Sequence, residues 1–99
     1  MKLIELNMTA IAALCKKYNV RKLFVFGSIL TDRFNDQSDV DFVVDFDRSK
    51  IKDIFDTFFD FQFSLEDLLG RKVDLVEEHA ITNRYFLEEV RETKQQIYG

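Results

Sequence analysis

Three aspartates in two apolar segments are the side chains best suited to chemistry. Asp39 and Asp41 flank a valine at the start of an apolar run that extends to Phe46, and Asp74 stands inside a second apolar segment. Side chains alternate along a β-strand, so Asp39 and Asp41 would point to the same face. Carboxylate oxygens are the hard ligands that Mg²⁺ takes, together with substrate phosphates. The three acids therefore indicate metal-assisted chemistry on a phosphorylated ligand.

A glycine and a serine stand ten residues before the acid pair. Gly27 and Ser28 follow the apolar run Leu-Phe-Val-Phe. A glycine permits a tight turn and lets a phosphate approach the backbone without a side chain in the way. We expect a short helical turn from Ser28 to Arg33, whose first N–H groups are free to bind phosphate. Gly27 and Ser28 are therefore candidates for holding a triphosphate.

These two parts together suit nucleotidyl transfer. Two magnesium ions can clamp the attacking and leaving oxygens of such a reaction. Asp39 and Asp41 would hold the metal, and Asp74 could complete the site from a neighbouring strand. A third acid on the attacking side could also help ionise the acceptor hydroxyl. The sequence thus predicts a nucleoside triphosphate as substrate and Mg²⁺, with two ions, as cofactor.

Helices and strands alternate along the chain in a way that would position these residues. Apolar residues spaced by three and four predict helices, and alternating or continuous apolar runs predict strands. We expect residues 1–99 to form one α/β domain, of the α+β kind. The expected helices cover residues 3–18, 51–69 and 81–98, and the expected strands cover residues 20–26, 39–46 and 72–77. Gly70 is a typical helix stop, and Asn19 tolerates the left-handed conformation found at helix ends.

Several other residues admit two interpretations. Phe59 and Phe63 lie off the main stripe of the helix 51–69; we expect them to widen its buried face, the alternative being an exposed aromatic patch for a partner. A break of this helix near Gln62 is possible, because Ser64 and Asp67 could form a capping box. The residues expected to have only structural or surface roles are Cys15 in the core and Asp45, Asp47, Arg71, Lys72 and His79 on the surface.

Composition limits the possible partners. The chain of 99 residues has a net charge of −4 and a sequence pI near 4.9. Such a surface repels a polyanion, so long DNA or RNA is not an expected substrate. No apolar run approaches the length of a membrane span, and no cleavable leader is evident, so we expect a cytoplasmic protein without membrane contact. A single cysteine agrees with a reducing compartment.

At this point the residues resemble a known family. The pattern consists of Gly27-Ser28, ten residues, Asp39-Val40-Asp41 after a serine, and a Val-Asp-Leu-Val segment after Leu-Leu-Gly-Arg-Lys. It resembles the minimal nucleotidyltransferases of the DNA polymerase beta superfamily, and the similarity covers nearly the whole chain. The resemblance implies a small mixed β-sheet with helices mainly on one face. It also implies Asp39 and Asp41 as metal ligands, Asp74 as the third acid, and Gly27 and Ser28 as the triphosphate contact.

The sequence departs from this family after Ser28. Many relatives have a basic residue and a glycine there, whereas this chain has Ile29-Leu30-Thr31-Asp32. Arg33 comes two places later than expected. Which cation would contact the triphosphate is therefore open, while the three acids are unaffected.

The acceptor is expected to be another protein, because the chain has no room for an acceptor-binding domain. The resemblance implies a specific partner, the HEPN-domain ribonuclease toxin of a toxin–antitoxin operon. The chain would then be an antitoxin that transfers AMP from ATP to a tyrosine hydroxyl of that toxin. Two alternatives stay open: an antitoxin or regulatory subunit that acts by binding alone, and transfer to a small molecule at an oligomer interface. The sequence does not determine the oligomeric state, and both homo- and hetero-oligomers are possible.

Overall fold

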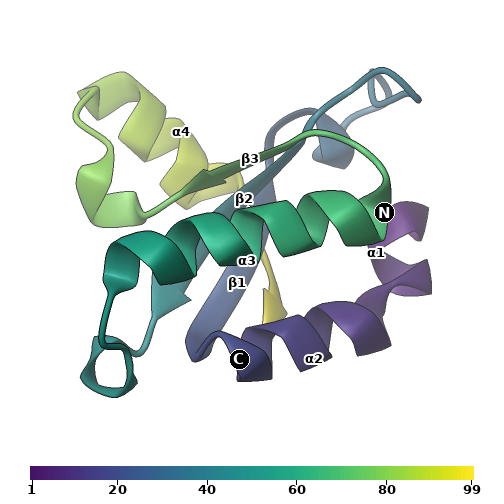
Figure 1. The fold of residues 1–99 in the computed structure, drawn as a ribbon. Helices are drawn as coiled ribbons and strands as arrows, with labels where there is room; N and C mark the ends of the chain where they lie inside the picture. Colours follow the sequence, from purple (N-terminus) through teal and green to yellow (C-terminus); the bar gives the residue numbers. More distant parts are fainter.

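A four-stranded mixed sheet forms the centre of the computed structural model, which describes residues 1–99. The strands are β1 (Val20–Phe26), β2 (Val40–Phe46), β3 (Val73–Val76) and β4 (Gln95–Tyr98), in the order β3-β2-β1-β4. β1 is antiparallel to both of its neighbours, and β2 is parallel to β3. β3 and β4 are therefore the two edge strands (Figure 1).

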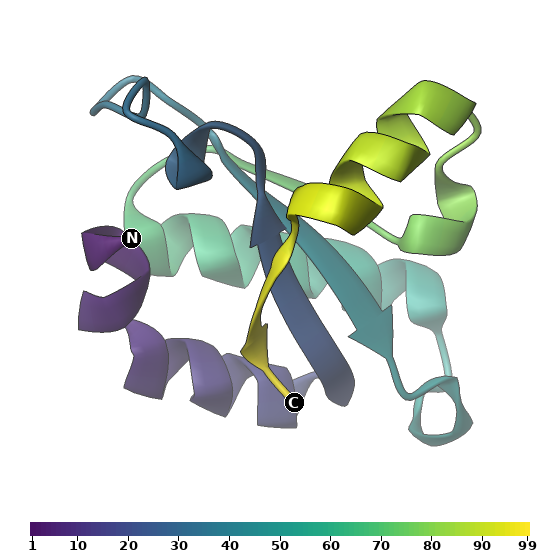
Figure 2. The same cartoon turned by 180° about the vertical axis from the view of Figure 1, so that it is seen from behind.

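The helices cover the two faces of the sheet unequally. The helices are α1 (Lys2–Leu6), α2 (Met8–Lys17), α3 (Ile54–Leu69) and α4 (Arg84–Thr93), with short 3-10 turns at Gly27–Leu30, Arg48–Lys50 and Glu78–Ala80. Figures 1 and 2 show α2 and α3 across one face and α4 against the other. This arrangement confirms the expected α+β fold with a small mixed sheet and helices mainly on one face.

The two faces of β2 explain how the core forms. Val40, Phe42, Val44 and Phe46 point toward α2 and α3 and belong to the main core, as the alternation of the sequence predicts. Val43 points the other way and packs in a small second cluster with Phe26 and with Val90 of α4. Cys15 is fully buried in the main core, in agreement with its expected structural role.

The N-terminal helix is not continuous, contrary to expectation. It is divided at Asn7, whose backbone leaves the helical region at φ −110° and ψ 8°. The Nδ2 atom of Asn7 donates to the carbonyl oxygen of Leu3 at 2.8 Å. An asparagine side chain can compete in this way for backbone hydrogen-bonding groups and interrupt a helix. The spacing of the apolar residues predicts one continuous helix, because it carries no information on this competition. Asn19 adopts the left-handed conformation, at φ 57°, as expected.

Helix α3 begins three residues later than predicted and runs without a break. The side chain of Asp53 accepts from the N–H of Asp56 at 3.1 Å and caps the helix start. Gly70 ends the helix in the left-handed conformation, at φ 66°, as expected. No break occurs near Gln62, because Ser64 contacts the hydroxyl of Tyr18 at 3.1 Å and forms no cap.

Two further expectations are wrong. Phe59 and Phe63 are 41% and 57% exposed, so they do not extend the buried face of α3. The expected C-terminal helix ends at Thr93, and the residues after Lys94 form β4 beside β1. Pairing with the open edge of β1 supplies backbone hydrogen bonds that local helix propensity does not anticipate. No helix of the structure is long and apolar enough to cross a lipid bilayer.

Candidate active site

Two of the predicted acids stand next to each other in the sheet. In the strand register, Asp41 of β2 lies opposite Phe26 of β1 and opposite Asp74 of β3. Residues at paired positions of adjacent strands point to the same face, so the two carboxyl groups meet on the face that α4 partly covers. Asp41 is half-buried, whereas Asp74 is exposed on the edge strand.

The contact between these carboxyl groups perturbs the ionisation of Asp41. Burial is the largest cause that raises its pKa, followed by a hydrogen bond to Asp74 and by the negative charges of Asp74 and Asp39. Together these effects raise the pKa of Asp41 to about 6 from an ordinary value of 3.8. Such crowding of like charges at a partly covered position is typical of a site where a cation or a proton is shared.

Asp39 lies at the margin of this pair. It immediately precedes β2, whose first N–H group, that of Val40, donates to the carbonyl oxygen of Lys72 at 3.1 Å. Asp39 is near enough to raise the pKa of Asp41 by its charge. However, no three His, Cys, Asp or Glu side chains are gathered closely enough to hold a metal ion by themselves. The structure thus brings Asp41 and Asp74 together and leaves Asp39 outside a compact ligand set.

Gly27 is required by the position of Asp41. Its φ of +78° lies in a region that residues with a side chain rarely adopt. A Cβ atom added to Gly27 would also overlap the Oδ2 atom of Asp41. The turn after β1 and the carboxylate of β2 are therefore in direct contact, which places the predicted phosphate turn beside the predicted metal ligand.

The turn after Gly27 is fixed by its own hydrogen bonds. Ser28 is the second residue of the 3-10 turn, and its carbonyl oxygen accepts from the N–H of Thr31 at 2.9 Å and from the Oγ1 of Thr31 at 2.8 Å. The same Oγ1 atom accepts from the N–H of Arg33 at 3.2 Å. Thr31, which departs from the family pattern, thus keeps the turn compact and determines where Arg33 leaves it.

A cavity of about 620 Å³ joins these parts. It is lined by Gly27, Ser28 and Arg33 from the turn and by Asp41 from β2. Arg33 is the one cationic residue of the lining, so the structure places a cation beside the turn although the sequence pattern left its identity open.

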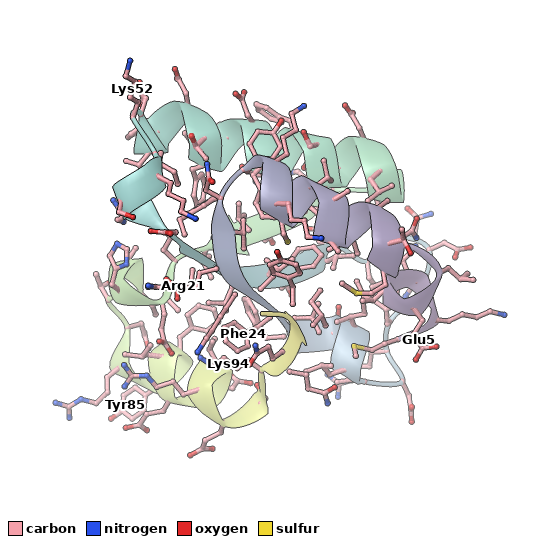
Figure 3. The ribbon with its side chains drawn as sticks, turned by 90° about the horizontal axis from the view of Figure 1, so that it is seen from below. Glu5, Arg21, Phe24, Lys52, Tyr85 and Lys94 are labelled. Carbon is pink, nitrogen blue, oxygen red and sulfur yellow. The ribbon has the colours of Figure 1, made fainter.

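Helix α4 supplies the opposite wall of this cavity, which the sequence analysis missed. Phe86, Glu89 and Thr93 line it from that side. Figure 3 shows Lys94 beside Phe24 at the end of α4; its Nζ lies 4.2 Å from the ring centroid of Phe24 and 3.3 Å from the Oε1 of Glu78. These contacts hold the end of α4 on the sheet. The spacing of the apolar residues along α4 predicts an amphipathic helix, but it does not predict which face of the sheet the helix covers.

Arg71 organises the loop that leads into Asp39. Its Nη1 donates to the carbonyl oxygens of Asn35 and Ser38, at 3.1 and 2.9 Å, and its guanidinium lies 4.7 Å from the ring centroid of Phe34. Arg71 is therefore more than the ordinary turn charge that the sequence suggests, because it braces the backbone next to the acid pair.

The remaining polar residues singled out in the sequence stay on the surface. Asp45 pairs with Arg21 at 3.1 Å, and Asp47 caps the turn that contains Ser49. The side chain of His79 is 66% exposed and lies 3.6 Å from Glu77. None of them lines the cavity, which agrees with the surface roles expected for them.

Comparison with known sequences identifies the family pattern in nearly the whole chain. The family model described as "Polymerase beta, Nucleotidyltransferase" matches residues 9–99. The protein named "Putative protein adenylyltransferase MJ0128" of Methanocaldococcus jannaschii is 37% identical over 77 residues, which are 78% of this chain and 76% of the relative.

Solved structures share the fold. A structure described as a "putative minimal nucleotidyltransferase" has a TM-score of 0.75 at 24% identity, covering 95% of this chain and 92% of the other. A chain from a toxin–antitoxin structure with AMP-PNP has a TM-score of 0.69 at 21% identity, covering 94% and 73%. A chain from the complex of the tri-AMPylated Shewanella oneidensis HEPN toxin with MNT antitoxin has a TM-score of 0.63 at 21% identity, covering 96% and 71%.

Proposed function

Because the chain belongs to the polymerase beta nucleotidyltransferase family, we propose that it transfers AMP from ATP to a tyrosine hydroxyl of a HEPN-domain ribonuclease toxin and thereby acts as an antitoxin. The observation that carries this proposal is the position of Asp41, which contacts Asp74 of the neighbouring strand and, together with Gly27, lines a cavity large enough for a nucleotide. The name of the 37% identical relative supports protein as the acceptor class. The AMPylated HEPN toxin in complex with a protein of the same fold supports the partner.

The acid pair fits a divalent cation. Asp41 and Asp74 offer hard carboxylate oxygens in contact. Burial, and then the hydrogen bond to Asp74 and the charges of Asp74 and Asp39, raise the pKa of Asp41, so a nearby positive charge would favour its ionised form. Asp41 and Asp74 would hold Mg²⁺, with Asp39, whose charge reaches Asp41, as the third acid. When bound, Mg²⁺ supplies neutralisation of the charge that develops on the phosphates.

The residues of the chain have separate tasks in this reaction. Gly27 leaves room for the phosphates, and Ser28 and the first N–H groups of the turn bind them, with Arg33 as the cation of the cavity. The tyrosine oxygen forms a bond to the α-phosphorus while the bond between that phosphorus and the α–β bridging oxygen breaks. The proton of the tyrosine passes to the carboxylate of Asp74, which is the exposed member of the pair. Pyrophosphate leaves.

Transfer of label from ATP tests this function. The protein is incubated with Mg²⁺, ATP and the product of the adjacent gene, with the label on either the α- or the γ-phosphate. We expect label on the partner only from the α-position. Label from neither position, together with tight complex formation, would refute transfer and support the second candidate below.

The second candidate is an antitoxin that neutralises its partner by binding alone. The observation in its favour is the exposed aromatic side chains of α3, among them Phe55 at 71% exposure. Large exposed aromatic residues in a row are typical of protein interfaces. The two candidates differ in one respect: binding alone requires neither the carboxylate of Asp41 nor ATP.

A further inference from the structure

Two polar side chains of α3 bind the backbone of β3. The helix leads into this strand through a short loop (Figure 1). Gln62 and Glu66 are one helical turn apart and therefore lie on the same side of α3. The Nε2 of Gln62 donates to the carbonyl oxygen of Val73 at 2.9 Å, and the Oε2 of Glu66 accepts from the N–H of Val73 at 3.0 Å. Both backbone polar groups of this strand residue are thus bound by side chains of the helix.

The backbone groups of Val73 point away from the neighbouring strand. The N–H of Val40 in β2 donates to the carbonyl oxygen of Lys72. In a parallel pair with this bond, the N–H of Asp74 also points toward β2, whereas the N–H and the carbonyl of Val73 point outward. An edge strand leaves such outward groups to water or to another chain. The two side chains of α3 therefore take the place of a further strand at this position.

The position of Asp74 depends on this part of β3. The strand has only four residues and lies at the edge of the sheet, and its register with β2 places Asp74 opposite Asp41. The planar peptide group between Val73 and Asp74 contains both the carbonyl that Gln62 binds and the N–H that points toward β2. This peptide group is therefore held on both sides, which restricts the point from which the side chain of Asp74 projects.

We propose that Gln62 and Glu66 are positioning residues of the candidate active site, which hold Asp74 where its carboxyl group meets that of Asp41. The inference rests on the proposed function in one respect, namely that Asp74 takes part in the transfer. Neither side chain of α3 lines the cavity, so each acts through the backbone of β3. Small displacements of a reacting group lower the rate of a reaction strongly. The rate of transfer should therefore depend on the two side chains, whereas the binding of ATP at the turn after β1 should not.

Substitutions that change hydrogen bonding with little change in volume separate this role from packing. At pH 8, Gln62→Glu replaces the amide donor by a carboxylate oxygen, which repels the carbonyl oxygen of Val73. Glu66→Leu removes the acceptor for the N–H of Val73, and Glu66→Gln restores one, because an amide oxygen can accept the same bond. Gln95→Glu is the control for the added charge, since Gln95 is exposed on β4 at the opposite edge of the sheet.

The kinetics of AMP transfer to the partner protein measure the effect, at a temperature at which circular dichroism shows every variant to be folded. We expect Gln62→Glu and Glu66→Leu to lower kcat roughly tenfold or more and to leave the KM for ATP unchanged. Glu66→Gln should recover most of the kcat, and Gln95→Glu should match the wild type. A wild-type kcat in Gln62→Glu would overturn the proposal and leave the two side chains only the role of covering the sheet edge. Equal losses in Glu66→Gln and Glu66→Leu would also overturn it.

Amide hydrogen exchange, followed by NMR, tests the same role without ATP, Mg²⁺ or partner. Glu66→Leu removes the acceptor of the Val73 N–H directly, but it affects the N–H of Asp74, on the other side of the strand, only if β3 becomes displaced. We expect the amide of Asp74 to exchange roughly tenfold faster in Glu66→Leu and in Gln62→Glu, while the amides of β1 keep their wild-type rates. Wild-type exchange of Asp74 in both variants would overturn the proposal. Equal acceleration in β1 and β3 would show a general loss of stability and would overturn it as well.

The outcome is separable from that of the proposed function. If the wild-type protein transfers no AMP, the proposed function fails, and hydrogen exchange still decides whether α3 holds Asp74 in place. Conversely, transfer by the wild type together with a wild-type kcat in Gln62→Glu would refute only the positioning role.

Discussion

Replacing Asp41 by asparagine should abolish AMP transfer and at the same time stabilise the metal-free protein at neutral and alkaline pH. The carboxylate of Asp41 is half-buried and lies against Asp74. When both are ionised and no cation is present, the native state carries an unfavourable interaction that the unfolded chain does not. Asparagine removes this charge, and its amide N–H can donate a hydrogen bond to Asp74. The substitution also deprives the protein of a charged metal ligand.

The size of the effect follows from the pKa of Asp41. A rise from 3.8 to about 6 corresponds to at most about 3 kcal/mol when the group is ionised. Since the side chain is only half-buried, solvent screens part of this interaction energy. We expect Asp41→Asn to raise the free energy of unfolding by about 1 to 2 kcal/mol. For a domain of this size, that difference raises Tm by roughly 5 to 12 °C.

The pH dependence has a definite sign. An acid whose pKa is higher in the native state than in the unfolded chain favours folding below its unfolded pKa, and this contribution is lost as pH rises through the native value. The wild-type protein in EDTA should therefore lose stability between about pH 4 and pH 7, around the native pKa of about 6. The asparagine variant lacks this loss.

Thermal unfolding in EDTA at pH 5 and pH 8 measures the difference. Asp45→Asn is the matched control, because Asp45 lies on the same strand but pairs with Arg21 on the surface. We expect Asp41→Asn to exceed the wild type in Tm at pH 8 and by only about half as much at pH 5, because pH 5 lies inside the range over which the wild type loses stability. Mg²⁺ should raise the Tm of the wild type and of Asp45→Asn, which keep all three acids, but not that of Asp41→Asn. A variant that is less stable than the wild type at pH 8 would refute the electrostatic argument.

Three further substitutions or treatments have expected outcomes. Gly27→Ala places a Cβ atom on the Oδ2 of Asp41 at a positive φ. We expect the free energy of unfolding, measured by chemical denaturation, to fall by about 1 to 3 kcal/mol and the transfer rate to fall roughly a hundredfold. Wild-type values of both would contradict the close contact. Arg33→Gln should raise the KM for ATP about tenfold. Arg21→Gln changes an arginine outside the cavity and should leave the KM unchanged. Equal effects of the two substitutions would refute a contact of Arg33 with the triphosphate. Burial raises the pKa of the Cys15 thiol to about 12. Iodoacetamide at pH 8 should therefore modify Cys15 only in denaturant, which mass spectrometry can measure. Fast modification of the native protein would contradict the burial of Cys15.

The sequence predicts correctly those helices and strands whose apolar residues pack in the main core. The alternation Val40, Phe42, Val44 gives the strand and its faces, and the same alternation places Asp41 on the opposite side. Gly27 and Gly70 mark a turn and a helix end because their backbone conformations exclude most other residues. The meeting of Asp41 with Asp74 depends in addition on the parallel pairing of two strands, which spacing alone does not determine.

The features that the sequence did not predict depend on long-range contacts. β4 exists because β1 has an open edge, and the local sequence Gln95 to Tyr98 carries no strong strand pattern. Phe59 and Phe63 are apolar and are therefore expected in the core, yet they lie on the exposed side of α3, while Phe61 and Leu65 of the same helix fill the core. Likewise, the wall that α4 adds to the cavity follows from the docking of Val90 beside Phe26, which no motif announces.

The most direct test of AMP transfer at the Asp41–Asp74 pair is tandem mass spectrometry of the partner protein after incubation with ATP and Mg²⁺. We expect AMP on a tyrosine of the partner with the wild-type protein and none with Asp41→Asn, whose circular dichroism should match the wild type. AMP attached to the same extent by the Asp41→Asn variant would contradict transfer at this pair.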